Sequence, residues 1–430
     1  MGCSPAGSNP SGWHKTVAFL KNIYPGILAV ILPLLVAAWT GLNFPPQYDE
    51  EAHRSFSKFI AEHPTWHTIL TYEGSQNYEA KAPLLFIISA VFGRLVGFQL
   101  YALRILTLCF SLASIYAFSR LLRLFQAEQS GMRASVFQCL PYYLILSVTF
   151  MTDVPCVALL LFAIFGYLSH LDSNKISHLV IGIVASSAVS YVRVDYLFPL
   201  IAIAFICWRH DLLSRKLIIG LALPFVLRLP LLLVWGGFAA PPAQTRPHAV
   251  GVGFQGSHLV FALAVIGLYF WPFIWEQIHW KRRQTLPLAA TATLLSAVLV
   301  FFWTPQILRN DVDRYAGTLR SLMIMMNNTH LQQCLWWALA TLGIFISITL
   351  LVPVVKSDPK LLCIQASCVI GLLMQAFRGN VIYERYLLEI SVFYLLVFAI
   401  LVKSNFNLLL WSLWCCTLQF TQLFKNGLLP

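Results

Sequence analysis

The sequence predicts an all-α, polytopic membrane protein, and its composition carries most of this prediction. Hydrophobic residues make up 58% of the 430 residues, whereas Asp, Glu, Lys and Arg together make up only 11%. Soluble domains carry about 25% charged residues, and disordered chains are poorer in apolar residues, so both classes are excluded. The apolar runs are continuous and do not alternate, which favours helices over a β-barrel.

We expect about 12 to 13 spans, since each needs about 20 apolar residues. The candidate runs cover residues 22–40, 102–123, 134–150, 154–171, 176–192, 194–208, 216–235, 258–278, 286–304, 331–354, 361–377, 386–402 and 406–424. The run 83–99 begins at Pro83 and carries Arg94 near its end. We expect this run to lie at the membrane interface without crossing.

The distribution of charge supports this topology. If 83–99 does not cross, most loop Lys and Arg residues fall on the cytoplasmic side and most acids fall on the opposite side, as the positive-inside rule requires. The net charge of +12 is then a topology signal, and we expect no nucleic-acid partner. The chain is predicted to form one transmembrane domain, residues 1–430. Its longer outer segments are 41–101, which holds the interfacial helices, 236–257 and 305–330.

Acidic residues on the outer side are the first candidates for chemistry. Asp49, Glu50 and Glu51 stand together in the outer segment that follows the first predicted span, and Asp153 stands between two apolar runs. Acids also favour helix starts, so a plain capping role is the simpler reading of each. The alternative is a pair of acids in one site, with Asp49 as a general base at the membrane surface.

Basic residues on the same side are candidates for phosphate binding. Arg193 and Asp195 interrupt an apolar stretch, where a local ion pair is the simpler reading. Arginine forks suit a phosphate, and histidines can assist. Further candidates are His53, His248, His258, Asp313, Arg314, Tyr315, Glu384, Arg385 and Tyr386.

Several chemistries have no motif in the sequence. There is no GxxxxGK[ST] for ATP binding and no HExxH or other zinc-ligand spacing. The ten cysteines lie mostly in apolar runs without a CxxC pair, which favours buried thiols over a metal site or a disulfide framework. We therefore expect no metal and no cofactor.

Scattered motifs resemble the GT-C superfamily of membrane glycosyltransferases. Pro46, Asp49, Glu50 and His53 are similar to the Pro-x-x-Asp-Glu-x-x-His motif of the dolichyl-phosphate-glucose alpha-1,2-glucosyltransferases. The segment from Lys81 to Leu84 resembles the Lys-x-Pro-Leu motif of the branch that holds the O-mannosyltransferases and the lipid A aminoarabinose transferases. Further similar segments are Ala102-Leu103-Arg104, Thr152-Asp153-Val154-Pro155 and Arg385-Tyr386-Leu387-Leu388.

The resemblance implies an inverting transfer of a sugar from a polyprenyl phosphate, dolichyl or undecaprenyl, which is a co-substrate. The acceptor would be a lipid-linked glycan or another molecule on the lumenal or periplasmic side. The membrane would be a bacterial inner membrane or the endoplasmic reticulum. Asp49, Glu50 and Asp153 would be catalytic, and Lys81 would join the phosphate-binding residues.

Two other classes of function remain open at this stage. A transporter or flippase for a lipid-linked or anionic substrate would use a gate such as Arg193 and Asp195 at the midplane, between repeated halves. A non-catalytic scaffold would keep the first-loop acids apart from the arginines. An enzyme would bring Asp49 and Asp153 together in one site.

Overall fold

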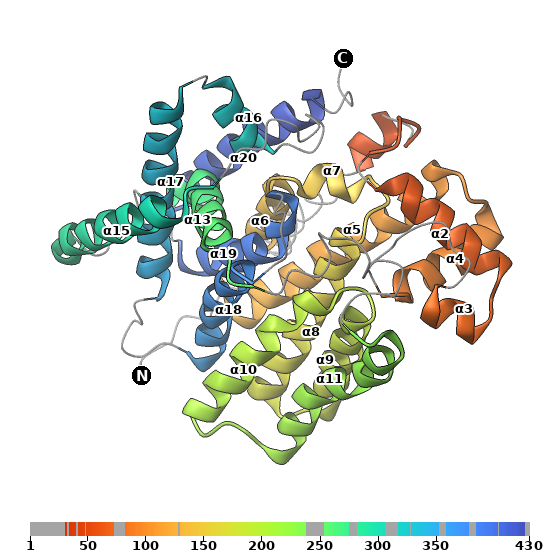
Figure 1. Cartoon of the computed structure of the whole chain (residues 1–430). Helices are drawn as coiled ribbons and strands as arrows, with labels where there is room; N and C mark the ends of the chain where they lie inside the picture. The colour runs from red at the N-terminus through yellow and green to blue at the C-terminus, as the bar shows by residue number, and fades with distance from the viewer. Residues whose placement is uncertain are drawn as a thin grey trace, which may run out of the picture.

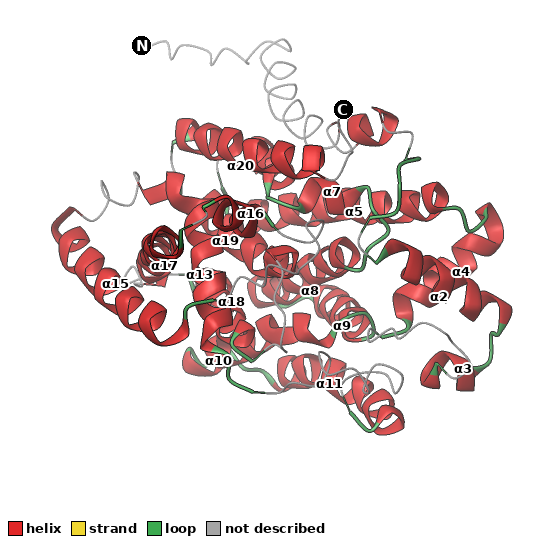
Figure 2. Cartoon of the chain, turned by 45° about the horizontal axis from the view of Figure 1, so that its top comes forward, coloured by secondary structure: helices red, strands yellow, loops and turns green. Residues whose placement is uncertain are grey.

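The computed structural model describes residues 31, 34–39, 42–47, 49–72, 82–127, 130–237, 253–274, 282–305, 317–326, 328–351, 358–377, 384–402 and 404–425. Within these ranges the regular structure is entirely helical (Figure 2), as predicted. The longer helices are α5 (Leu100–Leu124), α8 (Asp153–Ser173), α9 (Ile176–Ser190), α11 (Arg215–Trp235), α13 (Gly256–Phe270), α15 (Arg282–Trp303), α17 (Thr329–Leu351), α18 (Pro359–Gln375) and α20 (Asn405–Lys425). Shorter helices are α2 (Glu50–Glu62), α3 (Trp66–Thr71), α4 (Leu84–Val96), α10 (Phe198–Arg209), α16 (Thr318–Met325) and α19 (Leu388–Leu401).

Six helices in the described part of the chain are long and apolar enough to cross a membrane. They are α5, α8, α11, α15, α17 and the segment Gly256–Phe273, which joins α13 to a 3-10 turn. Large apolar side chains such as Leu286, Leu294 and Phe301 on α15 stay exposed. A chain with this surface needs a bilayer around it, and the protein is an all-helical polytopic membrane protein.

The other predicted spans correspond to shorter helices, and 406–424 to the 21-residue helix α20, except in two places. Most of the run 22–40 lies outside the described residues. The run 134–150 is not one helix but three short pieces: α6 (Ser130–Ser135), the 3-10 turn η1 (Val136–Cys139) and α7 (Tyr143–Ser147). Pro141 has no N–H for a helical ladder, and Tyr142 follows it with a φ of 66°, so the chain turns there.

The helices α2, α3 and α4 form a group at one side of the molecule, on the right in Figure 1. Phe56 on α2 packs against Phe86 on α4 and against Tyr72, with ring centroids 4.8 and 4.4 Å apart. At 13 residues α4 spans about 20 Å, against about 30 Å for the hydrocarbon core of a bilayer. Both observations agree with interfacial helices in the first outer segment.

The second half of the chain packs on the first through α18 and α19. The helix α18 lies against α10, and α19 contacts both α5 and α8. A 3-10 turn, η4 (Glu384–Leu387), leads into α19, as another, η2 (Val194–Leu197), leads into α10. These contacts bring η2 and η4, distant in sequence, to the end of the bundle where α8 begins.

Candidate functional site

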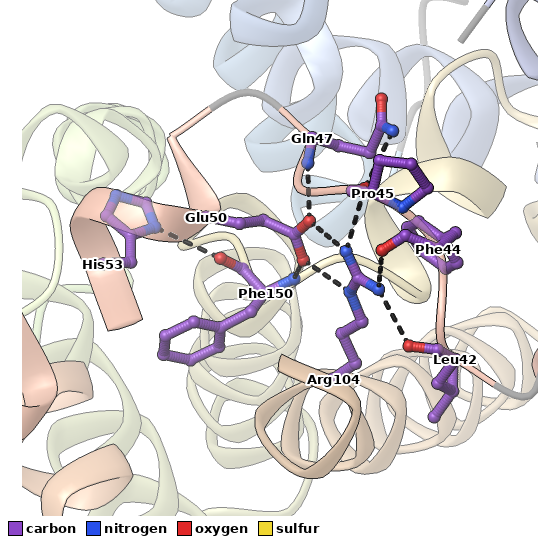
Figure 3. Close-up of polar contacts among 8 residues, drawn as sticks. All are labelled: Leu42, Phe44, Pro45, Gln47, Glu50, His53, Arg104 and Phe150. Carbon is purple, nitrogen blue, oxygen red and sulfur yellow. Dashed lines mark hydrogen bonds and ion pairs between the residues drawn. The ribbon is translucent and has the colours of Figure 1, made fainter. Parts of the chain in front are cut away.

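Glu50 and Arg104 form a fully buried ion pair between α2 and α5 (Figure 3). Arg104 donates from Nε to Oε1 of Glu50 at 2.8 Å and from Nη2 to Oε2 at 2.5 Å. Its remaining N–H groups donate to the carbonyl oxygens of Leu42, Phe44 and Pro45. All five donors of the guanidinium are thereby used.

The carboxylate of Glu50 is just as fully engaged. Besides Arg104 it accepts from the backbone N–H groups of Gln47 and Phe150 (Figure 3). The pair thus fastens the segment 42–47, the start of α2 and the segment before α8 to one another. Both carboxylate oxygens of Glu50 accept two hydrogen bonds each, which suits a structural role. The catalytic role expected of Glu50 stays a prediction.

Asp49, the residue before Glu50, points to a different part of the site. It occupies the cap position of α2, yet its side chain makes no cap hydrogen bond. Its Oδ2 instead accepts from Nη2 of Arg385 at 2.9 Å, and 44% of its side chain is exposed. The simple capping role does not account for this carboxylate.

Asp153 is also paired with a distant arginine. It is the first residue of α8, after the cap residue Thr152, and its Oδ1 accepts from Nη1 of Arg193 at 2.8 Å. Arg193 also donates from Nη2 to Asp195 at 2.8 Å, so the local pair predicted from sequence exists within a larger one. Asp153 is buried, whereas 37% of the Asp195 side chain is exposed.

Tyr386 connects these two ion pairs. Its ring lies 5.2 Å from the guanidinium of Arg385 and 5.6 Å from that of Arg193. Burial works to lower the pKa of Arg385, but Tyr386, Asp153 and Asp49 more than offset this and raise that pKa above its ordinary value. We call the six residues Asp49, Asp153, Arg193, Asp195, Arg385 and Tyr386 the charged cluster.

The charged cluster forms where four helical segments begin. Asp49 precedes α2, Asp153 opens α8, Arg193 precedes η2 and α10, and Arg385 lies in η4 before α19. Helix starts carry a partial positive charge that favours anions. The arrangement therefore combines two fixed cations, three carboxylates and the positive ends of α2 and α8.

Glu384, beside the cluster, holds the third outer segment. Its carboxylate accepts from Tyr269 Oη at 3.0 Å and from the backbone N–H of Leu319 at 2.6 Å, at the start of α16. Burial raises the pKa of Glu384, while these hydrogen bonds lower it in part. A Cβ on Gly317 would stand 2.1 Å from this carboxyl group, so any other residue there would displace the carboxyl group from its hydrogen bonds.

The two predicted histidines within the described residues, His53 and His258, are buried. His53 is buried, and its Nδ1 is 3.2 Å from the carbonyl oxygen of Phe150 (Figure 3). His258 is buried near the start of α13. The predicted residues Lys81, His248, Asp313, Arg314 and Tyr315 lie outside the described residues. In the described ranges no three His, Cys, Asp or Glu side chains are grouped so as to hold a metal ion.

Arg104 is the residue whose place sequence reasoning missed. In the sequence it belongs to the segment Ala102-Leu103-Arg104, and that segment assigns no role to it. An arginine in the first turns of an apolar helix is costly without a partner, and this cost was the available signal.

Comparisons with known proteins add a distant structural likeness. The sequence matches no family model, and no curated protein matches it. Two solved structures of ArnT from Cupriavidus metallidurans, one in the apo state and one bound to undecaprenyl phosphate, are similar with a TM-score of 0.42 and 14% identity. They cover 93% and 92% of this chain, which spans 77% of ArnT. A likeness of this degree does not by itself assign a family or an activity.

Proposed function

We propose that this chain is a membrane glycosyltransferase of GT-C type, which transfers a sugar from a polyprenyl-phosphate donor with inversion. The charged cluster carries the proposal. Asp49 and Asp153, from different helices, meet two arginines and a tyrosine from elements up to 336 residues apart. A scaffold has no need for this convergence, and the sequence resemblance points to the same chemistry.

Asp49 is the better candidate for the general base. Its side chain is 44% exposed and so can reach an acceptor hydroxyl, whereas the Asp153 side chain is only 2% exposed and tied to Arg193. Arg385 fixes the direction of the Asp49 carboxylate. We assign Asp153 to hold Arg193, and Glu50 to hold the loop that carries Asp49.

The proposed reaction assigns a step to each of these residues. The acceptor hydroxyl gives its proton to Asp49 as its oxygen bonds the anomeric carbon, and the bond from that carbon to the phosphate oxygen breaks with its electron pair on the phosphate. Arg193 and Arg385 stabilise the departing polyprenyl phosphate, aided by the helix starts around them. The leaving group needs no proton, so a single base is sufficient.

The alternative class is a transporter for an anionic lipid. A transport site is expected near the midplane, at broken helices in matching halves of the chain. Here the charges lie where helices begin, at one end of the bundle. That position favours chemistry at a membrane surface over passage through the membrane.

The decisive experiment is a transfer assay in proteoliposomes with glucose, mannose and aminoarabinose on undecaprenyl or dolichyl phosphate. Acceptor lipids are analysed by mass spectrometry. Asp49→Asn is expected to lower turnover by about 10²–10⁴-fold, the range for loss of a general base. Glu51→Gln is the matched control, because Glu51 lies two positions on and pairs only with the exposed Arg54 in the described structure.

Two results would contradict the proposal. If none of the donors released free polyprenyl phosphate, the assignment as an enzyme would be wrong. Transfer by the Asp49→Asn protein at the rate of Glu51→Gln would leave the enzyme but remove Asp49 as its base.

A further inference from the structure

Arg228 is a buried cation in the apolar helix α11. The residue is 2% exposed, and its Nε and Nη1 are buried without a hydrogen-bond partner. Among the described residues no Asp or Glu forms an ion pair with it. A cation in this position is costly unless an anion or water compensates it, and in membrane helices such residues mark sites of function.

The neighbours of Arg228 are aromatic faces. The guanidinium lies 4.9 Å from the ring of Trp235 and 5.9 Å from that of Tyr191. The polar atoms of both rings are engaged elsewhere: Trp235 donates to the carbonyl of Leu70, and Tyr191 donates to that of Leu227 at 2.6 Å. The rings therefore stack on the cation and give its Nε and Nη1 no acceptor.

The side chain reaches toward one end of the bundle. Trp235 lies seven residues after Arg228, or about 10 Å along the helix, on the same face. The guanidinium lies 4.9 Å from that ring, so it stands beside the last residue of α11, near the C-terminal end of the helix. Tyr191, two residues before Arg193, lies at this end, so the charged cluster and Arg228 share one end of the molecule.

The surroundings favour a lipid as the source of the missing anion. Large apolar side chains of α11 next to Arg228, Leu227 and Leu229, are 42% and 50% exposed. Leu227 and Leu229 point about 100° to either side of Arg228 around the helix axis, so acyl chains are suited to the two faces of α11 that flank the buried arginine. The end of the helix is where phosphate groups of lipids lie. The fork geometry of arginine matches a phosphate.

We propose that Arg228, between Trp235 and Tyr191, binds the phosphate group of a membrane lipid. The phosphate belongs to a phospholipid or to a polyprenyl monophosphate, and both present the same group at the same depth. The rings of Trp235 and Tyr191 lie beside the guanidinium. The proposal concerns binding alone and does not depend on sugar transfer.

The test measures lipid binding to the delipidated protein in detergent, by native mass spectrometry and by thermal unfolding. The probes are dioleoyl phosphatidate and undecaprenyl monophosphate, with dioleoylglycerol and undecaprenol as uncharged partners and inorganic phosphate as a free anion. Arg228→Met is expected to weaken binding of a phosphate lipid at least about tenfold. Arg120→Met is the matched control, because Arg120 also stacks over two rings, of Tyr116 and Phe165, near the other end of α5.

The same variants separate a binding role from a structural one. Arg228 has no hydrogen-bond partner for its Nε and Nη1, so the delipidated Arg228→Met protein is expected to unfold no earlier than wild type. A lower unfolding temperature with unchanged lipid binding would overturn the proposal. Arg228→Lys keeps the charge but loses the fork, and it is expected to bind phosphate lipids less tightly than wild type.

The probes also test the ligand in the wild-type protein alone. Tighter binding of phosphatidate than of undecaprenyl monophosphate assigns a structural phospholipid, and the reverse order assigns the carrier. If dioleoylglycerol and undecaprenol bound as tightly as the phosphate lipids, a lipid phosphate site would be contradicted. The same holds if inorganic phosphate, at the same concentration, raised the unfolding temperature as much as the phosphate lipids do.

Discussion

Glu50 and Arg104 meet across 54 residues of sequence with neither side chain exposed to solvent. The pair closes on the segment 42–47, in which Leu42 has a φ of 54°, an unfavourable conformation for leucine. Arg104 stabilises this conformation, because its Nη1 donates a hydrogen bond to the Leu42 carbonyl oxygen at 2.8 Å. The position of Asp49, one residue before Glu50, therefore depends on this pair.

Breaking the pair from one side is expected to be costly. Glu50→Gln and Arg104→Met should each lower the free energy of unfolding by about 3–5 kcal/mol, because each leaves a buried charge without its partner. Unfolding in detergent, followed by circular dichroism, measures this loss. The double variant Glu50→Gln/Arg104→Met should lose clearly less than the sum of the two. Additive losses would show that the two side chains act independently.

Arg193 is expected to matter for the donor more than for the fold. Arg193→Lys keeps a cation beside Asp153 but cannot hold Asp153 and Asp195 with a planar fork. We expect kcat/KM for the sugar donor to fall about 10- to 100-fold, with little change in the unfolding temperature. Lys58→Arg exchanges the same two residue types at an exposed site on α2 and is the control, expected to leave kcat/KM unchanged. An unchanged kcat/KM would remove Arg193 from phosphate binding.

Gly317 is expected to be intolerant of any side chain. Alanine there would place its Cβ 2.1 Å from the Glu384 carboxyl group and displace the start of α16. We predict a loss of about 1–3 kcal/mol in stability, the range for overpacking. At Gly253 an added Cβ meets no atom within 4 Å, so Gly253→Ala provides the matched control. Equal unfolding temperatures for the two variants would contradict this packing.

Glu384 is expected to make stability depend on pH. Because burial raises its pKa above the ordinary 4.5, the folded protein binds this proton more tightly than the unfolded chain does. The stabilisation of the folded state by protonated Glu384 is complete below about pH 4.5 and is lost as the pH rises through the pKa of this group in the folded state. Unfolding temperatures measured against pH should fall less steeply for Glu384→Gln than for wild type. Parallel curves would contradict this, and Glu62→Gln, at an exposed acid on α2, should leave the curve unchanged.

The sequence by itself determined the class of protein and most of its helices. Apolar runs long enough for spans give α5, α8, α11, α15 and α17 because burial in lipid obliges the backbone to satisfy its own hydrogen bonds. The prediction of one span at 134–150 is wrong because hydropathy, averaged over a window, does not register the single helix-breaking residue Pro141.

Only the tertiary structure decided what each acid does. Asp49 is the cap residue of α2 and Glu50 is its first residue, so their side chains point in different directions, and composition cannot tell which faces the interior. Packing against α5 turned Glu50 to Arg104, and this left Asp49 directed at Arg385. Arg228 stands alone in an apolar helix in the sequence, and only the packing of Trp235 and Tyr191 shows where its charge is directed.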